Sequence, residues 1–279
     1  MRRLACFPLV LVLLGAAAPL RAEPLRVLVS IPPQKYLVQR IGGERVEVRT
    51  MLQPGHAPET FEPSPRQIAL LSGASLYFRA GVPFERSWIE PLAAGNPALE
   101  IIDCCGELAL QSRQDGNAGG DPHVWVHPLN ALQMAELMSR TLIRIDPANG
   151  GDYTANLEAL RADLVRLHAD IQGALHGRRT RYFIISHGSL GPFADAYGLV
   201  QIALEAGGHS AGPRQLAGIV RLARTEGIGT ILVQKQFSLA PARTLAAELD
   251  AQLIEVDPLA DDYIAGMRAI AAAVAAATR

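Results

Sequence analysis

Short apolar runs alternate along the chain with longer stretches in which apolar residues recur every three or four positions. The short runs are rich in β-branched residues and end at turn-forming residues, which is typical of strands and helices alternating around parallel sheets. In the first half they are Leu25–Ser30, Arg45–Leu52, Leu76–Ala80 and Leu99–Asp103. In the second half they are Tyr182–Ser186, Val200–Glu205, Thr230–Gln234 and Gln252–Val256. The pattern predicts an α/β protein in two similar halves.

A long segment between the halves has no strand character. From Asp152 to His176, leucine and isoleucine recur three or four positions apart, and Gly177 follows as a helix-ending residue. At ~1.5 Å per residue, such a helix is roughly 35–40 Å long. We therefore expect two lobes with parallel-type sheets joined by one long rigid helix. The expected parts are a first lobe over 23–148, the connecting helix over 149–177 and a second lobe over 178–279.

The first residues have the composition of a targeting segment. Arg2 and Arg3 form a short positive start, an apolar run follows from Phe7 to Ala18, and small residues precede Ala22. This pattern is typical of a secretory signal peptide and is too short to span a bilayer. We therefore expect residues 1–22 to be removed on export and the mature protein to be periplasmic.

The charge balance and the cysteines narrow the function classes. The formal net charge of −1 gives no electrostatic field for nucleic acid, so we expect no nucleic-acid partner. Outside the predicted signal peptide the chain has two cysteines, Cys104 and Cys105, which are adjacent and exclude a disulfide framework. They could form a vicinal bridge or bind a soft metal. We favour the interpretation that both cysteines act as small buried hydrophobic residues at a strand end.

Four side chains with metal-binding chemistry lie after strands or in loops. His187 and Asp257 each follow a predicted strand directly, His56 lies four residues past Leu52, and His123 follows a Gly-rich loop. Ligands of open parallel sheets bind at the carboxyl ends of the strands. Imidazole and carboxylate are ligands that zinc prefers, and four of them close a tetrahedral site, as a carrier requires.

Several motifs carry a resemblance to a known family. They are Gln53–Pro58, Phe61–Pro65, Asp121–Trp125, Ser186–Gly188, Phe193–Gly198 and Val256–Leu259. In this order they resemble the zinc/manganese-binding family of periplasmic solute-binding proteins, which deliver metal to ABC importers. The resemblance extends from about Arg26 to the C-terminus. It implies a divalent metal ion, Zn²⁺ first and Mn²⁺ second, held in the cleft between the lobes of a monomer, and an ABC permease in the inner membrane as partner.

On that family pattern, His123, His187 and Asp257 match ligand positions. The first ligand departs from it, because the family usually has histidine directly after the proline of this loop, where this chain has Glu59. Either the loop re-routes so that His56 binds, or Glu59 binds as a carboxylate, which makes manganese more plausible. We favour His56, which lies beside a glycine in an adaptable loop. The family's His-rich loop is absent from Gln111–Gly120.

Two other functions compete with metal capture. An exported zinc hydrolase would need an open coordination position and a general base, and the chain has neither an HExxH motif nor a nucleophile elbow. A binder of an organic ligand or metal chelate would use the histidines as hydrogen-bond donors. We therefore predict a metal site of His56, His123, His187 and Asp257 with no catalytic residues.

The remaining polar candidates have weaker signals. We expect His127 at the surface and His209 in a loop, and we expect neither histidine of the long helix to be a ligand. Gln234 and Gln236 end a strand and could line the cleft.

Overall fold

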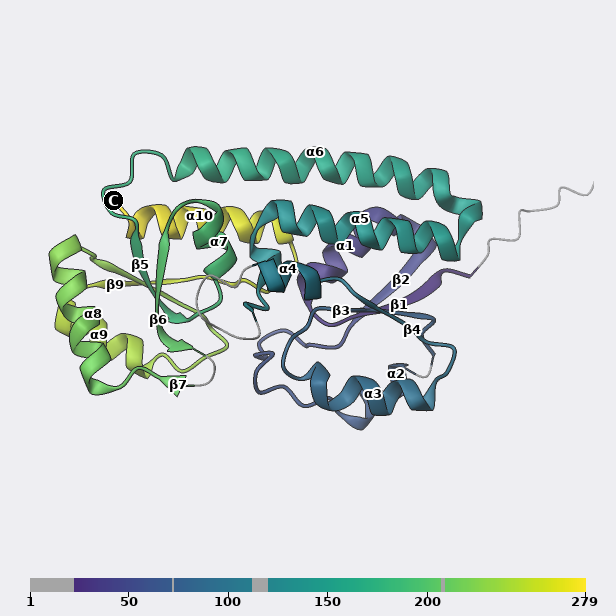
Figure 1. Cartoon of the computed structure of the whole chain (residues 1–279), viewed down its shortest axis with the longest axis horizontal. Helices are drawn as coiled ribbons and strands as arrows, with labels where there is room; N and C mark the ends of the chain where they lie inside the picture. The colour runs from purple at the N-terminus through teal and green to yellow at the C-terminus, as the bar shows by residue number, and fades with distance from the viewer. Residues whose placement is uncertain (1–22, 72, 112–119, 207–208) are drawn as a thin grey trace, which may run out of the picture.

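A computed structural model describes residues 23–71, 73–111, 120–206 and 209–279. The predicted signal peptide and most of the polar loop 111–120 therefore lie outside the described residues. The chain forms a four-stranded sheet of order β2-β1-β3-β4 and a five-stranded sheet of order β7-β6-β5-β8-β9. Figure 1 shows the two lobes side by side under one long helix, α6, which confirms the predicted architecture.

The first lobe contains a fully parallel sheet. Its strands are β1 Leu25–Val29, β2 Val46–Thr50, β3 Leu76–Arg79 and β4 Glu100–Asp103. Its helices are α1 Pro32–Gly42, α2 Pro65–Leu71, α3 Glu85–Gly95, α4 Gly106–Gln111 and α5 Pro128–Ile145, with 3-10 turns η1 Gly43–Arg45 and η3 Val124–Val126. All four strands predicted for this half are present.

The second lobe repeats the arrangement with one addition. Its strands are β5 Tyr182–His187, β6 Val200–Ala206, β7 His209–Ser210, β8 Thr230–Val233 and β9 Gln252–Glu255. Its helices are α7 Gly191–Ala196, α8 Pro213–Glu226, α9 Ala240–Leu249 and α10 Tyr263–Ala277. The four predicted strands pair in parallel. The two-residue strand β7, expected as loop, pairs antiparallel to β6 at the sheet edge and is too short to give a sequence pattern.

The connecting helix α6 spans Gly150–Ala174, 25 residues, after the 3-10 turn η4 Pro147–Asn149. It packs against α1 and α5 of the first lobe and α10 of the second. An Arg40–Asp163 ion pair of 2.7 Å joins it to α1, and an Arg268–Asp170 pair of 2.9 Å joins it to α10. The helix is thus fixed to both lobes along its length.

One apolar cluster crosses both lobes. The buried face of α6, including Leu160 and Leu167, joins Val29 of the first sheet and Phe183 of the second in this cluster. The Trp125 indole N–H adds a hydrogen bond of 2.9 Å from the first lobe to the Pro258 carbonyl of the second. A shared core of this kind resists hinge motion, since opening it would expose apolar surface.

Two further expectations concern exposure and membrane spans. Cys104 and Cys105 are free and buried directly after β4, as favoured from the sequence. Among the described residues, no helix combines the length and apolar character needed to cross a bilayer.

Candidate metal site

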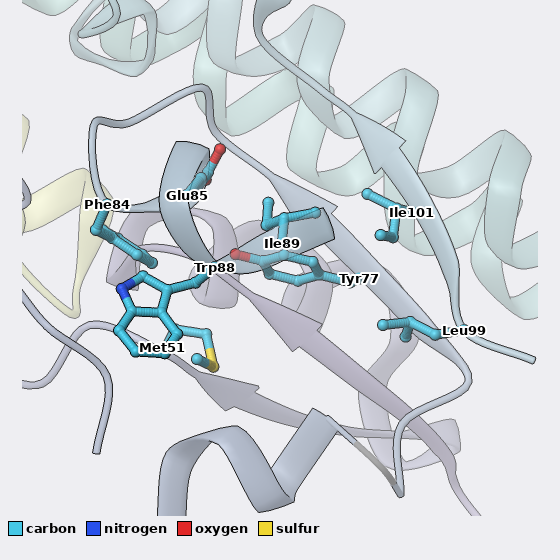
Figure 2. A pocket seen from close by; sticks show the side chains of 8 residues that line it. All are labelled: Met51, Tyr77, Phe84, Glu85, Trp88, Ile89, Leu99 and Ile101. Carbon is cyan, nitrogen blue, oxygen red and sulfur yellow. The ribbon is translucent and has the colours of Figure 1, made fainter. Parts of the chain in front are cut away.

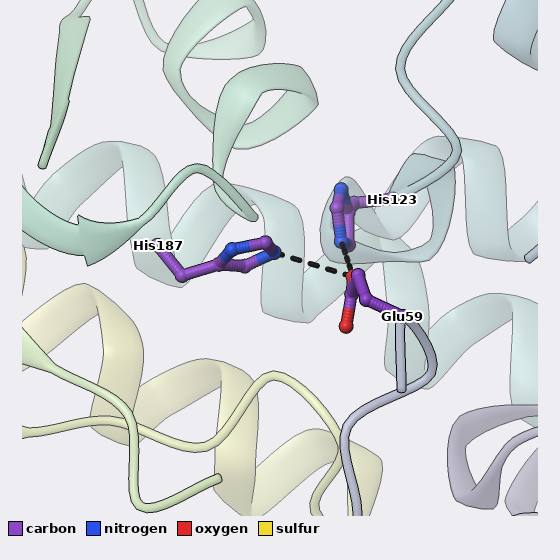
Figure 3. Close-up of side chains that lie close together, drawn as sticks. All are labelled: Glu59, His123 and His187. Atoms are coloured by element: carbon purple, nitrogen blue, oxygen red, sulfur yellow. Dashed lines mark ion pairs between the residues drawn. The ribbon is translucent and has the colours of Figure 1, made fainter. Parts of the chain in front are cut away.

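Three side chains from separate segments converge between the lobes (Figure 3). Glu59 lies in the loop after β2, His123 stands at the start of η3, and His187 is the last residue of β5. Two of the segments belong to the first lobe and one to the second. Strand direction explains the meeting, because the carboxyl ends of β2 and β5 each deliver their loops to the binding edge of a sheet.

The spacing of the donor atoms fits a small cation. One Glu59 carboxylate oxygen lies 3.6 Å from His123 Nε2 and 3.3 Å from His187 Nε2. One donor atom from each residue lies within 4.8 Å of the other two. Among the described residues, these are the three metal-binding side chains that come this close together. Ligands at the usual zinc distances of a tetrahedral site lie about 3.4 Å apart. The side chains are therefore spaced as ligands of one ion.

Burial and charge have opposite effects on these groups. Burial alone would raise the pKa of Glu59, but the imidazoles of His123 and His187 hold it well below its ordinary value. Burial alone would lower the pKa of His123, but the carboxylates of Asp121 and Glu59 raise it to about 9. Glu59 is thus a carboxylate at neutral pH, and His123 without a metal ion holds a proton that a bound ion would have to displace.

The His123 ring is oriented by a second carboxylate. Asp121 accepts a hydrogen bond of 2.9 Å from the His123 backbone N–H and lies 2.7 Å from its ring Nδ1. This contact directs Nε2 toward Glu59, as in the carboxylate–histidine pairs that orient metal ligands. A Cβ at Gly191 would lie 2.2 Å from the Asp121 carboxylate, so a larger residue there would displace Asp121.

The His187 ring is held by packing. It stacks on Phe237 with ring centroids 4.0 Å apart and an interplanar angle of 13°. Both ring nitrogens of His187 and one carboxylate oxygen of Glu59 are buried without a hydrogen-bond partner. Leaving buried polar atoms unpaired costs free energy. A cation bound between the two histidines and Glu59 Oε1 would give His187 Nε2 a partner.

Comparisons with known proteins identify related sequences. The family described as zinc-uptake complex component A, periplasmic, matches residues 27–277. The chain belongs to this family. It is 25% identical over 260 residues to a putative metal-binding protein of Chlamydia trachomatis, covering 90% of each chain. It is 26% identical over 220 residues to the high-affinity zinc uptake system protein ZnuA of Paracoccus denitrificans, covering 66% of this chain and 67% of that protein.

Solved structures show the same fold. A crystal structure of a ZnuA deletion mutant with bound zinc superposes with a TM-score of 0.85 at 33% identity, covering 92% of this chain and 98% of that one. The family resemblance noted from the sequence motifs is thus confirmed, and so is the two-lobe fold joined by a long helix.

In this family member, the structure brings Glu59 rather than His56 close to His123 and His187, and which of the two binds an ion stays a prediction. His56 is exposed, and its ring packs edge-on against Phe61 with centroids 5.7 Å apart. Gly55, directly before His56, has a φ of +85°. Glu59 faces the two histidines (Figure 3). The sequence signal for Glu59 was its place directly after Pro58, where the family usually has histidine.

The structure places Asp257 beside other partners. Lys235 Nζ lies 2.7 Å from one Asp257 oxygen, and the Gln236 side-chain amide donates a hydrogen bond of 2.9 Å to the other. Asp257 is not one of the three side chains whose donor atoms lie within 4.8 Å of one another. Asp257 follows β9 at the carboxyl end of this strand, where the sequence predicted it. Its carboxylate is paired there with Lys235.

The structure corrects the expectation that His127 lies at the surface. It is half-buried at the junction of α5, α6 and α7, with its ring centroid 5.6 Å from that of His168 and 6.3 Å from that of Tyr197. Burial and the neighbouring His168 lower the pKa of His127 to about 4, so the ring is neutral at pH 7. The contacts of His127 with His168 and Tyr197 indicate that it packs these helices together.

A separate pocket lies within the first lobe (Figure 2). Its lining residues are Met51, Tyr77, Phe84, Glu85, Trp88, Ile89, Leu99 and Ile101. The Glu85 carboxylate accepts hydrogen bonds from the backbone N–H groups of Ala80 at 2.7 Å and Gly81 at 2.8 Å, and from the Ser30 hydroxyl. These contacts fix the turn between β3 and α3, so we assign Glu85 a structural role.

Proposed function

We propose that this protein is the substrate-binding component of a metal ABC importer. It captures one divalent transition metal ion and delivers it to a permease in the inner membrane. The observation that carries the proposal is the convergence of Glu59, His123 and His187 from both lobes at 3.3 and 3.6 Å. Because the proposed ligands come from two lobes, the ion would lie between them.

Zinc is the ion that we propose. Two imidazole nitrogens and a carboxylate oxygen are ligands of borderline metals, and zinc binds more tightly than manganese to a given nitrogen and oxygen site. Two of the donor separations, 3.3 and 3.6 Å, are close to those of a tetrahedral site, which zinc adopts in proteins. Manganese is the second choice, favoured by the carboxylate at position 59.

The ligand set that we propose is Glu59, His123 and His187, with Asp257 as a fourth ligand. Glu59 replaces His56, because His56 is exposed and Glu59 faces both histidines. Four protein ligands leave no coordination position for an activated water, and this distinguishes a carrier from a hydrolase. We therefore propose a binding protein without catalytic activity.

The proposal includes the route and the assembly. The positive start and apolar run of residues 1–22 support export as a signal peptide to the periplasm. We propose that the mature protein acts as a monomer, since each chain supplies a ligand set of its own.

Native mass spectrometry of the metal-stripped mature protein tests the function. We expect one zinc ion per chain after titration, displacement of manganese by zinc, and no hydrolysis of ester or peptide substrates. Hydrolytic turnover with bound zinc would favour the exported hydrolase. Binding only in the presence of a chelator would favour the metal-chelate binder, and binding of no metal would refute the proposal.

A further inference from the structure

The loop between β8 and α9 contacts both of the second-lobe ligand positions. Phe237 stacks on the His187 ring at 4.0 Å, and the Gln234 side-chain amide donates a hydrogen bond of 3.3 Å to the His187 carbonyl. Two residues between them, Lys235 and Gln236, hold the Asp257 carboxylate. One short loop therefore determines how the second lobe presents its ligands.

Both oxygens of Asp257 have partners. The Lys235 ammonium lies 2.7 Å from Oδ2, while the Gln236 amide at 2.9 Å and the Leu259 backbone N–H at 3.1 Å bind Oδ1. Of these partners only Lys235 has a charge. Lys235 contacts Oδ2, the oxygen that neither neutral donor binds.

Lys235 is suited to leave when a stronger cation arrives. Its side chain is 46% exposed, whereas that of Asp257 is 24% exposed, so the ammonium can move into water while the carboxylate stays in place. A lysine ammonium is a strongly hydrated charge on a flexible stem, which makes such a contact easy to exchange. The two neutral donors would remain and keep Asp257 oriented.

We propose that Lys235 is a counter-cation that competes with the metal ion for Asp257. Asp257 then joins Glu59, His123 and His187 as a ligand only when the ion displaces the ammonium. The inference rests on the proposed function, because it needs a metal ion at this site. Its consequence is a site with lower affinity and faster release than the same ligands would give without Lys235, since the ammonium can return to the carboxylate as the ion leaves.

The test uses a matched pair of variants. The chain has two lysines, Lys35 and Lys235, so the same substitution at Lys35 serves as the control. Lys235→Met removes the competing charge, and Lys35→Met makes the same substitution in α1 of the other lobe. Zinc affinities are measured by competition with a chromophoric chelator. Partly exposed ion pairs of this kind have small energies, so we expect Lys235→Met to bind zinc roughly two- to fivefold more tightly. We expect Lys35→Met to match wild type.

A double-mutant cycle makes the result specific to Asp257. In an Asp257→Asn background, Lys235→Met should leave zinc affinity unchanged, because the contested carboxylate is gone. An unchanged or weaker affinity in Lys235→Met alone would overturn the inference, and so would an equal gain in the Asp257→Asn background. The wild-type titration separates this failure from a failure of the proposed function, in which wild type itself would bind no zinc.

A second measurement follows the ammonium directly. Reductive methylation with ¹³C-formaldehyde labels both lysines, keeps their charge and gives two side-chain signals, which Lys35→Met assigns. We expect the Lys235 signal to shift on addition of one equivalent of zinc and the Lys35 signal to stay. A Lys235 signal that does not respond to zinc would contradict displacement.

Discussion

Substitution of Glu59 and of His56 separates the two readings of the first ligand. Glu59→Gln keeps the size of the side chain and removes its charge, while His56→Ala removes an exposed ring. In the structure one Glu59 oxygen lies 3.6 Å from His123 Nε2 and 3.3 Å from His187 Nε2, whereas His56 packs on Phe61 outside the group. The two variants should therefore have very different effects on metal binding.

The magnitude follows from the role of each side chain. Loss of a residue that only orients a ligand costs about 10–100-fold in metal affinity. Glu59 would be a ligand and the only anionic one in the group of three, so we expect Glu59→Gln to weaken zinc binding by at least ~100-fold, or about 2.8 kcal/mol. We expect His56→Ala to stay within about twofold of wild type, as is usual for exposed substitutions away from a site.

Competition titration of the metal-stripped mature proteins gives both affinities, and circular dichroism of each metal-free variant checks that it is folded. Native mass spectrometry of the same samples reports the number of ions bound. Strong weakening by His56→Ala together with near-wild-type binding by Glu59→Gln would refute the reasoning, since the loop would then present His56 to the ion.

Three further predictions test the site and its support. His187→Ala should weaken zinc binding at least ~100-fold in the same titration while the metal-free fold is kept, and retained affinity would contradict its role. Trp125→Phe loses the hydrogen bond to Pro258 and buried ring atoms, so the free energy of unfolding in urea should fall by about 2–4 kcal/mol; a loss below about 1 kcal/mol would contradict this account. Burial and His168 lower the pKa of His127 to about 4. The unfolded chain therefore binds this proton more readily, and metal-free stability should decrease as the pH falls from about 6.5 toward 4, less steeply in His127→Gln than in wild type.

Much of the fold follows from the pattern of apolar residues. The eight predicted strands are all present because β-branched runs between turn residues mark buried parallel strands, and the spacing of leucines such as Leu160 and Leu167 marks the buried face of α6. The short edge strand β7 was missed, since its two residues, His209 and Ser210, pair only through the sheet edge.

The site was only partly predictable, for a physical reason that differs among its residues. Strand direction brings His187 to the binding edge, because a residue that ends a parallel strand has little freedom. The loop after β2 has more freedom, and in it Glu59 lies beside the two histidines while His56 is exposed. The ion pair between Lys235 and Asp257 joins residues on different loops, and no local pattern in the sequence indicates it.

The most direct test of the account is anomalous diffraction at the zinc absorption edge from crystals of the zinc-bound mature protein. We predict a single strong peak between the lobes, about 2.0–2.2 Å from a Glu59 oxygen, His123 Nε2 and His187 Nε2. A peak bound by residues of one lobe alone, or a peak with Glu59 turned away from it, would contradict the claim that both lobes hold one ion between them.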